Sequence, residues 1–79
     1  MDLNELVANV LEINIKEVVL EMSPQSTPEW TSLKQIKLIS EIEQNYGIKF
    51  SFKEMKQLKS MKMYVDILQA KGIEVSLSE

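Results

Sequence analysis

The sequence predicts a small all-α bundle of three longer helices, with one short helix between the second and the last. Apolar residues recur at helical spacing over three stretches, each flanked by residues that start or end helices. Only two glycines and two prolines occur in 79 residues, which leaves too few turns for a many-stranded sheet. The chain is 44% hydrophobic and 27% charged, the composition of a folded protein. Its length suits a single domain over residues 1–79, with a tail over 74–79 that is expected to fray.

The first helix is expected over about residues 3–13. Asp2 and Glu5 stand at the spacing of a capping box, in which each side chain accepts a hydrogen bond from the backbone N–H of the other. The apolar residues that follow share one helical face: Leu3, Leu6, Val7, Val10 and Leu11. The next apolar patch, from Asn14 to Met22, is compatible with a continuation of this helix or with a separate turn.

A long connector is predicted over residues 23–30, which contain both prolines and several turn-forming Ser and Thr residues. Within it, Thr27, Pro28 and Glu29 are typical of the N-cap and first positions of a single turn. Trp30 is expected to pack over the bundle, because the lone Trp of a small domain is usually largely buried.

The central helix is expected to begin at Ser32, to run to about residue 46 and to end before Gly47. Its apolar positions recur at helical spacing: Leu38, Ile39, Ile42 and Tyr46. Ile48 and Phe50 then alternate with a lysine, which indicates a short extended connector with its apolar side turned inward.

Two further helices complete the predicted bundle. Ser51 and Glu54 form a second capping-box pattern and open a short helix that ends near Leu58. Ser60 is expected to cap the last helix, which ends at Gly72. One face of that helix is apolar: Met61, Tyr64, Val65 and Leu68.

The composition excludes several kinds of function. The chain contains no Cys and no His, so disulfides, thiol nucleophiles, imidazole bases and zinc sites built on these ligands are excluded. Carboxylates and lysines are plentiful, but no pattern pairs them as a catalytic constellation, so the chain is not expected to be an enzyme. No apolar run reaches the length of a membrane span, and the acidic N-terminus is unlike a signal peptide. A cytoplasmic monomer with no membrane contact is therefore expected.

The charge of the chain is unevenly distributed. The formal net charge is −3, but residues 32–62 hold seven lysines against three glutamates. A basic segment of this kind is compatible with nucleic-acid binding. The sequence contains no Arg, however, and base and phosphate recognition depends heavily on bidentate Arg contacts. Nucleic acid is therefore not an expected partner.

The order of the predicted elements and three local patterns resemble a known family. Ser32 and Leu33 open the central helix, and the stretch from Ile42 to Phe50 closes it with an acidic-aromatic-Gly-Ile pattern. Ser60 begins the last helix at a matching distance from this close. Over about residues 3–70, the chain thereby resembles acyl carrier proteins and the related peptidyl and aminoacyl carrier domains.

The resemblance implies that Ser32 is the attachment point for 4′-phosphopantetheine, which a phosphopantetheinyl transferase takes from coenzyme A. The thiol of this group would hold an acyl or aminoacyl intermediate as a thioester for loading and acyl-transfer enzymes of a specialised biosynthetic pathway. The implied docking face for these enzymes comprises Leu33, Lys34, Ile36, Lys37, Ser40 and Glu41. The implied acyl pocket is lined by Ile42, Phe50, Met55, Leu58 and Tyr64.

Three departures from the family pattern shape this expectation. The family usually has Asp immediately before the modified Ser, whereas this chain has Thr31. Family members are typically acidic where this chain carries lysines. These lysines either form a solvated surface without a partner or fit a dedicated partner whose docking surface is acidic or apolar. Met55 and Tyr64 stand where the family often has small residues, so we expect a narrow pocket and a short, polar or aminoacyl cargo.

Two alternatives to the carrier interpretation stay open at the level of sequence. Ser32 and Gln35 themselves form a capping-box pattern, so Ser32 is equally suited to a purely structural role as a helix cap. Exposed apolar residues such as Leu33 and Ile36 are common on protein surfaces and need no partner. The second functional hypothesis is therefore a carrier-like helical module that is never modified and serves in protein interaction or regulation.

Overall fold

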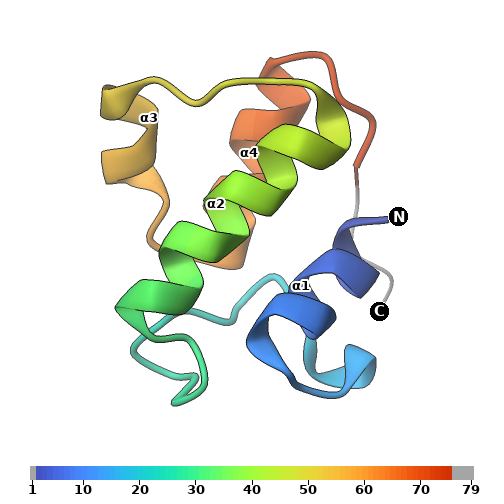
Figure 1. The fold of residues 1–79 in the computed structure, drawn as a ribbon, viewed down its shortest axis with the longest axis vertical. Helices are drawn as coiled ribbons and strands as arrows, with labels where there is room; N and C mark the ends of the chain where they lie inside the picture. Colours follow the sequence, from blue (N-terminus) through green and yellow to red (C-terminus); the bar gives the residue numbers. More distant parts are fainter. Residues whose placement is uncertain (1, 76–79) are drawn as a thin grey trace.

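The computed structural model describes residues 2–75, which form four α-helices and one short 3₁₀ helix (Figure 1). The helices are α1 (Leu3–Leu11), α2 (Ser32–Tyr46), α3 (Phe52–Gln57) and α4 (Met61–Ala70), and the 3₁₀ helix η1 is Ile15–Glu17. This part of the chain contains no strand. The predicted all-α bundle of three longer helices and one short helix is confirmed.

Helix α1 begins as predicted and ends two residues earlier than predicted. Asp2 and Glu5 form the expected capping box, with Asp2 Oδ1 accepting from Glu5 N at 2.9 Å. The helix stops at Leu11 because Glu12 adopts a left-handed conformation with φ 59°, which places Ile13 outside the helix. The N–H of Ile13 still donates to Ala8 O at 3.1 Å, which closes the C-terminal turn.

The patch after α1 is a separate turn. Asn14 caps η1 by accepting from Lys16 N at 2.9 Å, and the Glu17 carboxylate accepts from Asn14 N at 2.9 Å. These reciprocal side-chain bonds satisfy the backbone locally, as in a capping box. The chain therefore reverses direction here, and α1 does not continue past Leu11.

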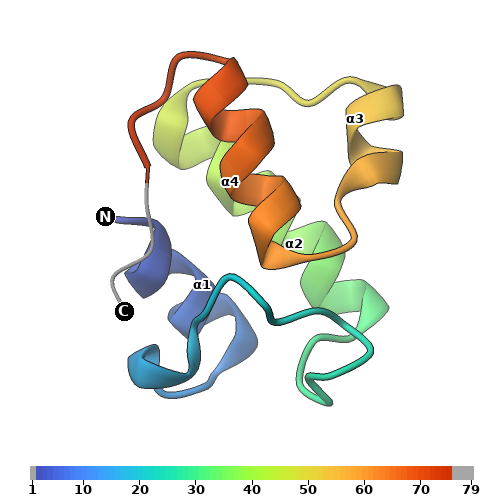
Figure 2. The same cartoon turned by 180° about the vertical axis from the view of Figure 1, so that it is seen from behind.

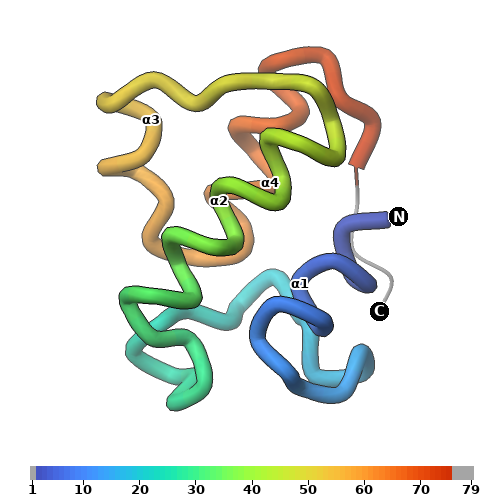
Figure 3. Tube along the Cα trace, viewed as in Figure 1, coloured from blue at the N-terminus to red at the C-terminus, as the bar shows by residue number. Residues whose placement is uncertain are grey.

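The connector between η1 and α2 is tied to the start of α4 by its backbone. Met61 N donates to Met22 O at 3.0 Å, and Lys62 N donates to Leu20 O at 3.2 Å. These bonds satisfy two N–H groups that the first turn of a helix leaves free. Figures 2 and 3 show the connector passing below the first turn of α4 before it turns into α2. The predicted turn after Thr27 is present, with Trp30 N donating to Thr27 O at 2.9 Å.

The core lies between α1, α2 and α4. Side chains from all three helices and from the connectors contribute to one buried apolar cluster, in which Leu38, Ile42, Tyr64 and Leu68 have no exposed surface. Trp30 belongs to the same cluster, and its ring centroid lies 5.9 Å from that of Tyr64. The prediction that Trp30 packs into the bundle is confirmed.

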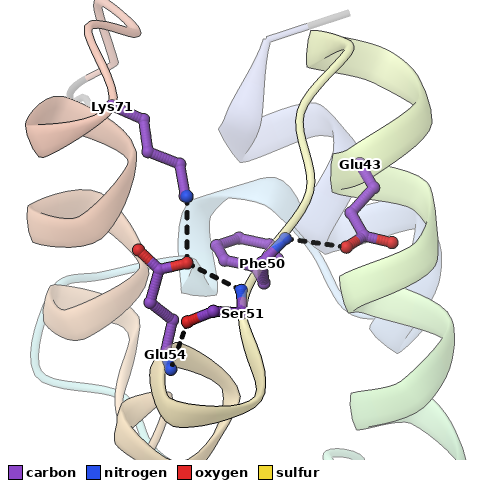
Figure 4. A network of polar contacts seen from close by, with 5 residues as sticks. All are labelled: Glu43, Phe50, Ser51, Glu54 and Lys71. Atoms are coloured by element: carbon purple, nitrogen blue, oxygen red, sulfur yellow. Dashed lines mark hydrogen bonds and ion pairs between the residues drawn. The ribbon is translucent and has the colours of Figure 1, made fainter.

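A polar network fixes the connector between α2 and α3 (Figure 4). Gly47 ends α2 in the left-handed conformation, with φ 65°, as its position predicted. The carboxylate of Glu43 accepts from Phe50 N at 2.9 Å, which holds the extended segment against α2 while the Phe50 ring enters the core. Glu54 accepts from Ser51 N at 2.8 Å and forms an ion pair with Lys71 at 2.9 Å, which joins α3 to the end of α4.

Helix α4 ends in the predicted glycine cap. Gly72 has φ 86°, and Ile73 N donates to Leu68 O at 3.0 Å while the Ile73 side chain packs against the core. Of the tail expected to fray, residues 76–79 lie outside the described part of the chain. Val75, within it, accepts a hydrogen bond from the Gln69 side chain at 2.9 Å.

Candidate functional site

Ser32 is the first residue of α2, and the cap of this helix is Thr31. Thr31 has extended backbone angles, φ −83° and ψ 172°, and its Oγ1 accepts from Lys34 N at 3.3 Å. The interpretation of Ser32 and Gln35 as a capping box is therefore wrong, because the helix starts one residue earlier than that pattern requires. Ser32 is exposed, and no hydrogen bond within residues 2–75 engages its hydroxyl.

The first turn of α2 presents free backbone donors beside this hydroxyl. Thr31 N donates to Glu29 O at 3.1 Å and Lys34 N donates to the cap, but the N–H groups of Ser32 and Leu33 have no acceptor among the described residues. The first turn of α2 contains no acidic residue. The positive end of the helix dipole is therefore unopposed at this position.

The side chain of Gln35 forms a bridge behind Ser32. Its Oε1 accepts from Trp30 Nε1 at 2.7 Å, and its Nε2 donates to Leu58 O at 3.0 Å. The amide thus joins the connector before α2 to the segment after α3 and satisfies the indole N–H of a buried Trp.

Ser32 lies on the edge of a shallow groove next to this bridge. The groove has a volume of about 340 Å³ and lies between the connector before α2 and the segment between α3 and α4. It is lined by Pro24, Gln25, Trp30, Thr31, Ser32, Gln35, Leu58 and Lys59. A group attached to the Ser32 hydroxyl would therefore have a concave surface beside it.

The predicted docking residues on α2 are mostly at the surface. Leu33 is 79% exposed and Ile36 is 66% exposed, and both lie away from the buried Leu38. Lys37, Ser40 and Glu41 are exposed as well. Lys34 differs, because its Nζ lies 2.7 Å from Glu12 Oε2 and ties α2 to the end of α1. The hydrogen bond from Lys34 also lowers the pKa of Glu12. The docking role of these residues stays a prediction.

The structure brings together four of the five predicted pocket residues. Ile42, Phe50, Leu58 and Tyr64 belong to the buried cluster. Met55 does not, since its side chain is 37% exposed. The reason is that α3 has only six residues, none of them buried, so its apolar side chains stay at the surface. Any interior binding space would therefore be bounded by the other four residues and not by Met55.

Among these residues, Tyr64 carries a polar group into the buried cluster. Its ring packs against Trp30 and meets the ring of Phe50 edge-on, with a centroid distance of 6.4 Å. Its hydroxyl is buried and has no hydrogen-bond partner of acceptable geometry among the described residues. Burial raises the pKa of Tyr64, and the nearby Gln35 side chain lowers that pKa by less. The phenol therefore stays protonated and able to donate.

Three features of the site were missed by sequence reasoning. Nothing local marks Gln35 as the partner of Trp30, since the two residues come together only once the connector folds onto α2. The unpartnered hydroxyl of Tyr64 also depends on tertiary packing. The exposure of Phe52 could have been predicted from the sequence, because a large apolar residue directly after the cap of a two-turn helix has little buried core to pack against. It is 73% exposed and lies under Lys56 Nζ, 4.6 Å from its ring centroid.

Comparison with known proteins adds no identification. No model of a protein family matches the chain, and no curated protein matches it. Across residues 2–75, no helix combines the length and the apolar character needed to cross a membrane.

Proposed function

We propose that this chain is a carrier protein that holds an acyl or aminoacyl group on 4′-phosphopantetheine attached to Ser32. The observation that carries the proposal is that Thr31, and not Ser32, caps α2. Thr31 caps the helix, so the adjacent Ser32 hydroxyl is exposed and free of structural hydrogen bonds within the described chain. A hydroxyl in this position is accessible to a transferase, whereas a capping hydroxyl would be engaged with the backbone.

The surroundings of Ser32 favour a phosphodiester at this position. The free N–H groups of Ser32 and Leu33 and the helix dipole stabilise a negative charge by about 0.3–1 kcal/mol in an exposed setting. When bound, the prosthetic group would supply a thiol that carries the cargo as a thioester. The chain itself would supply the attachment oxygen, the anion-stabilising helix end and the groove beside it.

In this proposal the chain is not an enzyme but acts with others. A phosphopantetheinyl transferase modifies Ser32, and loading and acyl-transfer enzymes of a specialised pathway dock on α2 through Leu33 and Ile36. The lysines near this face suit partners with an acidic or apolar dock and disfavour enzymes that select acidic carriers. A cytoplasmic monomer that binds neither nucleic acid nor membrane fits this role.

A second candidate function is an unmodified carrier-like module for protein interaction. Thr31 favours it, because the residue before Ser32 lacks the negative charge that the resembled family usually presents to the transferase and its metal. Thr31 keeps the capping role that an Asp would have at this position, so only the charge is missing.

Intact-mass measurement distinguishes the two functions. The chain is incubated with coenzyme A and a broad-specificity phosphopantetheinyl transferase, with a known carrier protein as a positive control. We expect the mass of one phosphopantetheine to be added, to be lost in Ser32→Ala, and to be retained in Ser26→Ala, which removes an exposed hydroxyl outside the predicted docking face. No added mass while the control is fully loaded, or added mass that persists in Ser32→Ala, would refute the carrier proposal.

A further inference from the structure

Lys59 is the one charged residue that lines the groove beside Ser32, and no lining residue is acidic. Lys59 is exposed and forms no ion pair within residues 2–75. Two other lysines of the basic segment, Lys34 and Lys62, each have a carboxylate partner. The positive charge of Lys59 is therefore available to an anion that enters the groove.

The backbone next to Lys59 is fixed relative to the first turn of α2. Gln35, which lies on the same helix as Ser32, donates from Nε2 to Leu58 O at 3.0 Å. Lys59 follows Leu58 directly, and its N–H donates to Gln57 O at 2.9 Å. These bonds hold the base of the Lys59 side chain at the groove, while its flexible stem leaves the ammonium group free to adjust to an anion there.

A second source of positive potential lies on the other side of the same groove. The backbone N–H groups of Ser32 and Leu33 have no acceptor among the described residues, and the first turn of α2 contains no acidic residue. The helix end and the lysine come from different segments of the chain, so they are independent of each other. A phosphate attached to the Ser32 oxygen would meet both of them.

The rest of the groove suits the part of the prosthetic group that follows its phosphate. That part is a carbon with two methyl groups and then an amide. Pro24 and Leu58 provide apolar surface in the groove. The side chain of Gln25 is exposed and makes no hydrogen bond within residues 2–75, so its amide can both donate to and accept from another amide.

We infer that Lys59 binds the prosthetic group: its ammonium group pairs with the phosphodiester on Ser32 and holds the phosphate end of the arm in the groove. This inference rests on the proposed function. The thiol end of the arm, which lies farthest from the phosphate, stays available to partner enzymes. A lysine that only solubilises the surface would leave the whole arm mobile, so the order of the arm distinguishes the two roles.

Nuclear magnetic resonance of the modified chain measures that order. The transferase loads the chain with 4′-phosphopantetheine labelled with ¹³C and ¹⁵N, and intact mass confirms the loading. We expect the methyl and amide resonances nearest the phosphate to differ from those of the same arm after unfolding in urea, with coenzyme A in urea as the solvent reference. We also expect a higher heteronuclear NOE at this amide in the folded chain, because a docked amide is ordered on the ps–ns timescale.

Three substitutions assign the docking to Lys59. In Lys59→Gln we expect the ratio of docked to free arm to fall by about 1.5–5-fold, the range for an exposed ion pair. Lys59→Arg should retain the ratio, and so should Lys53→Gln, which removes an exposed lysine of α3 that does not line the groove. Raising the salt concentration from about 0.05 M to about 0.5 M should weaken docking in the wild type more than in Lys59→Gln.

The outcome separates this inference from the carrier proposal. A loaded wild-type arm with the resonances of the unfolded chain, or equal losses in Lys59→Gln and Lys53→Gln, would overturn the role of Lys59. The added mass would then still support the carrier function. If no mass is added to Ser32, the carrier proposal itself fails and this inference fails with it.

Discussion

The Gln35 bridge is the contact whose removal most directly tests the geometry of the site. Gln35→Ala removes both ends of the bridge at once. Trp30 Nε1, on a side chain that is only 3% exposed, would lose its acceptor at 2.7 Å, and Leu58 O would lose its donor at 3.0 Å. We expect a loss of stability well beyond that of an ordinary substitution in a partly buried position.

The magnitude follows from the two groups left behind. An indole N–H that stays buried without an acceptor costs about 1–3 kcal/mol, and the lost bond to the Leu58 carbonyl adds about 0.5–1.5 kcal/mol. The sum is about 1.5–4.5 kcal/mol. For a domain of 79 residues, in which 1 kcal/mol shifts the unfolding temperature by about 4–8 °C, this corresponds to a fall in that temperature of roughly 6–36 °C.

Thermal and urea unfolding followed by circular dichroism and by Trp30 fluorescence measure this loss. Gln44→Ala is the matched control, because that amide is exposed and makes only a 3.5 Å contact with Ser40, so a change within about 0.5 kcal/mol is expected. Gln35→Glu retains an acceptor for Trp30 but no donor for Leu58 O at neutral pH, and should fall between the wild type and Gln35→Ala. A Gln35→Ala variant as stable as the control would refute the bridge and, with it, the fixed wall of the groove.

Three further predictions concern the cap, the core and the acid limit of stability. Thr31→Ala should lower the free energy of unfolding, measured in urea, by about 1 kcal/mol, whereas Ser32→Ala should change it by less than about 0.5 kcal/mol; similar losses in both would contradict the assigned cap. Tyr64→Phe should stabilise the unmodified chain by about 1 kcal/mol, and a lower midpoint would reveal a partner for the hydroxyl. Hydrogen bonding from Ser51 N lowers the pKa of Glu54, so its stabilisation is present above the ordinary carboxyl value of 4.5 and is lost as the pH falls through the lowered value. The stability difference between wild type and Glu54→Gln should therefore be full at pH 7 and shrink below pH 4.5, and a difference that does not depend on pH would contradict this assignment.

The elements that depend on local signals could be predicted from the sequence. Both bounds of α2 were predicted, because the hydroxyl residues before it and Gly47 after it act on their own backbone. The end of α1 could not be predicted, since Glu12 adopts a left-handed conformation that its residue type does not favour. Its ion pair with Lys34, across from α2, forms only in the folded bundle.

The sequence predicted which residues of the candidate site are exposed on α2, but not which side chains contact one another. The exposed hydroxyl of Ser32 and the exposed faces of Leu33 and Ile36 follow from helical periodicity, which places them opposite the buried positions of α2. The exposure of Met55 does not follow from it, because periodicity says which face a side chain occupies but not whether a two-turn helix has a core to face. That depends on where the connectors place α3.

The free state of the Ser32 hydroxyl is itself a consequence of tertiary structure. Thr31 and Ser32 are both good caps by residue type, so the sequence alone leaves the choice between them open. The choice is made by Trp30, whose ring is held in the core by Tyr64 and whose indole N–H is held by Gln35. With Trp30 fixed on one side and Gln35 N donating to Thr31 O at 2.9 Å on the other, Thr31 takes the extended cap conformation. The helix then begins at Ser32, and the Ser32 hydroxyl is not used as a cap.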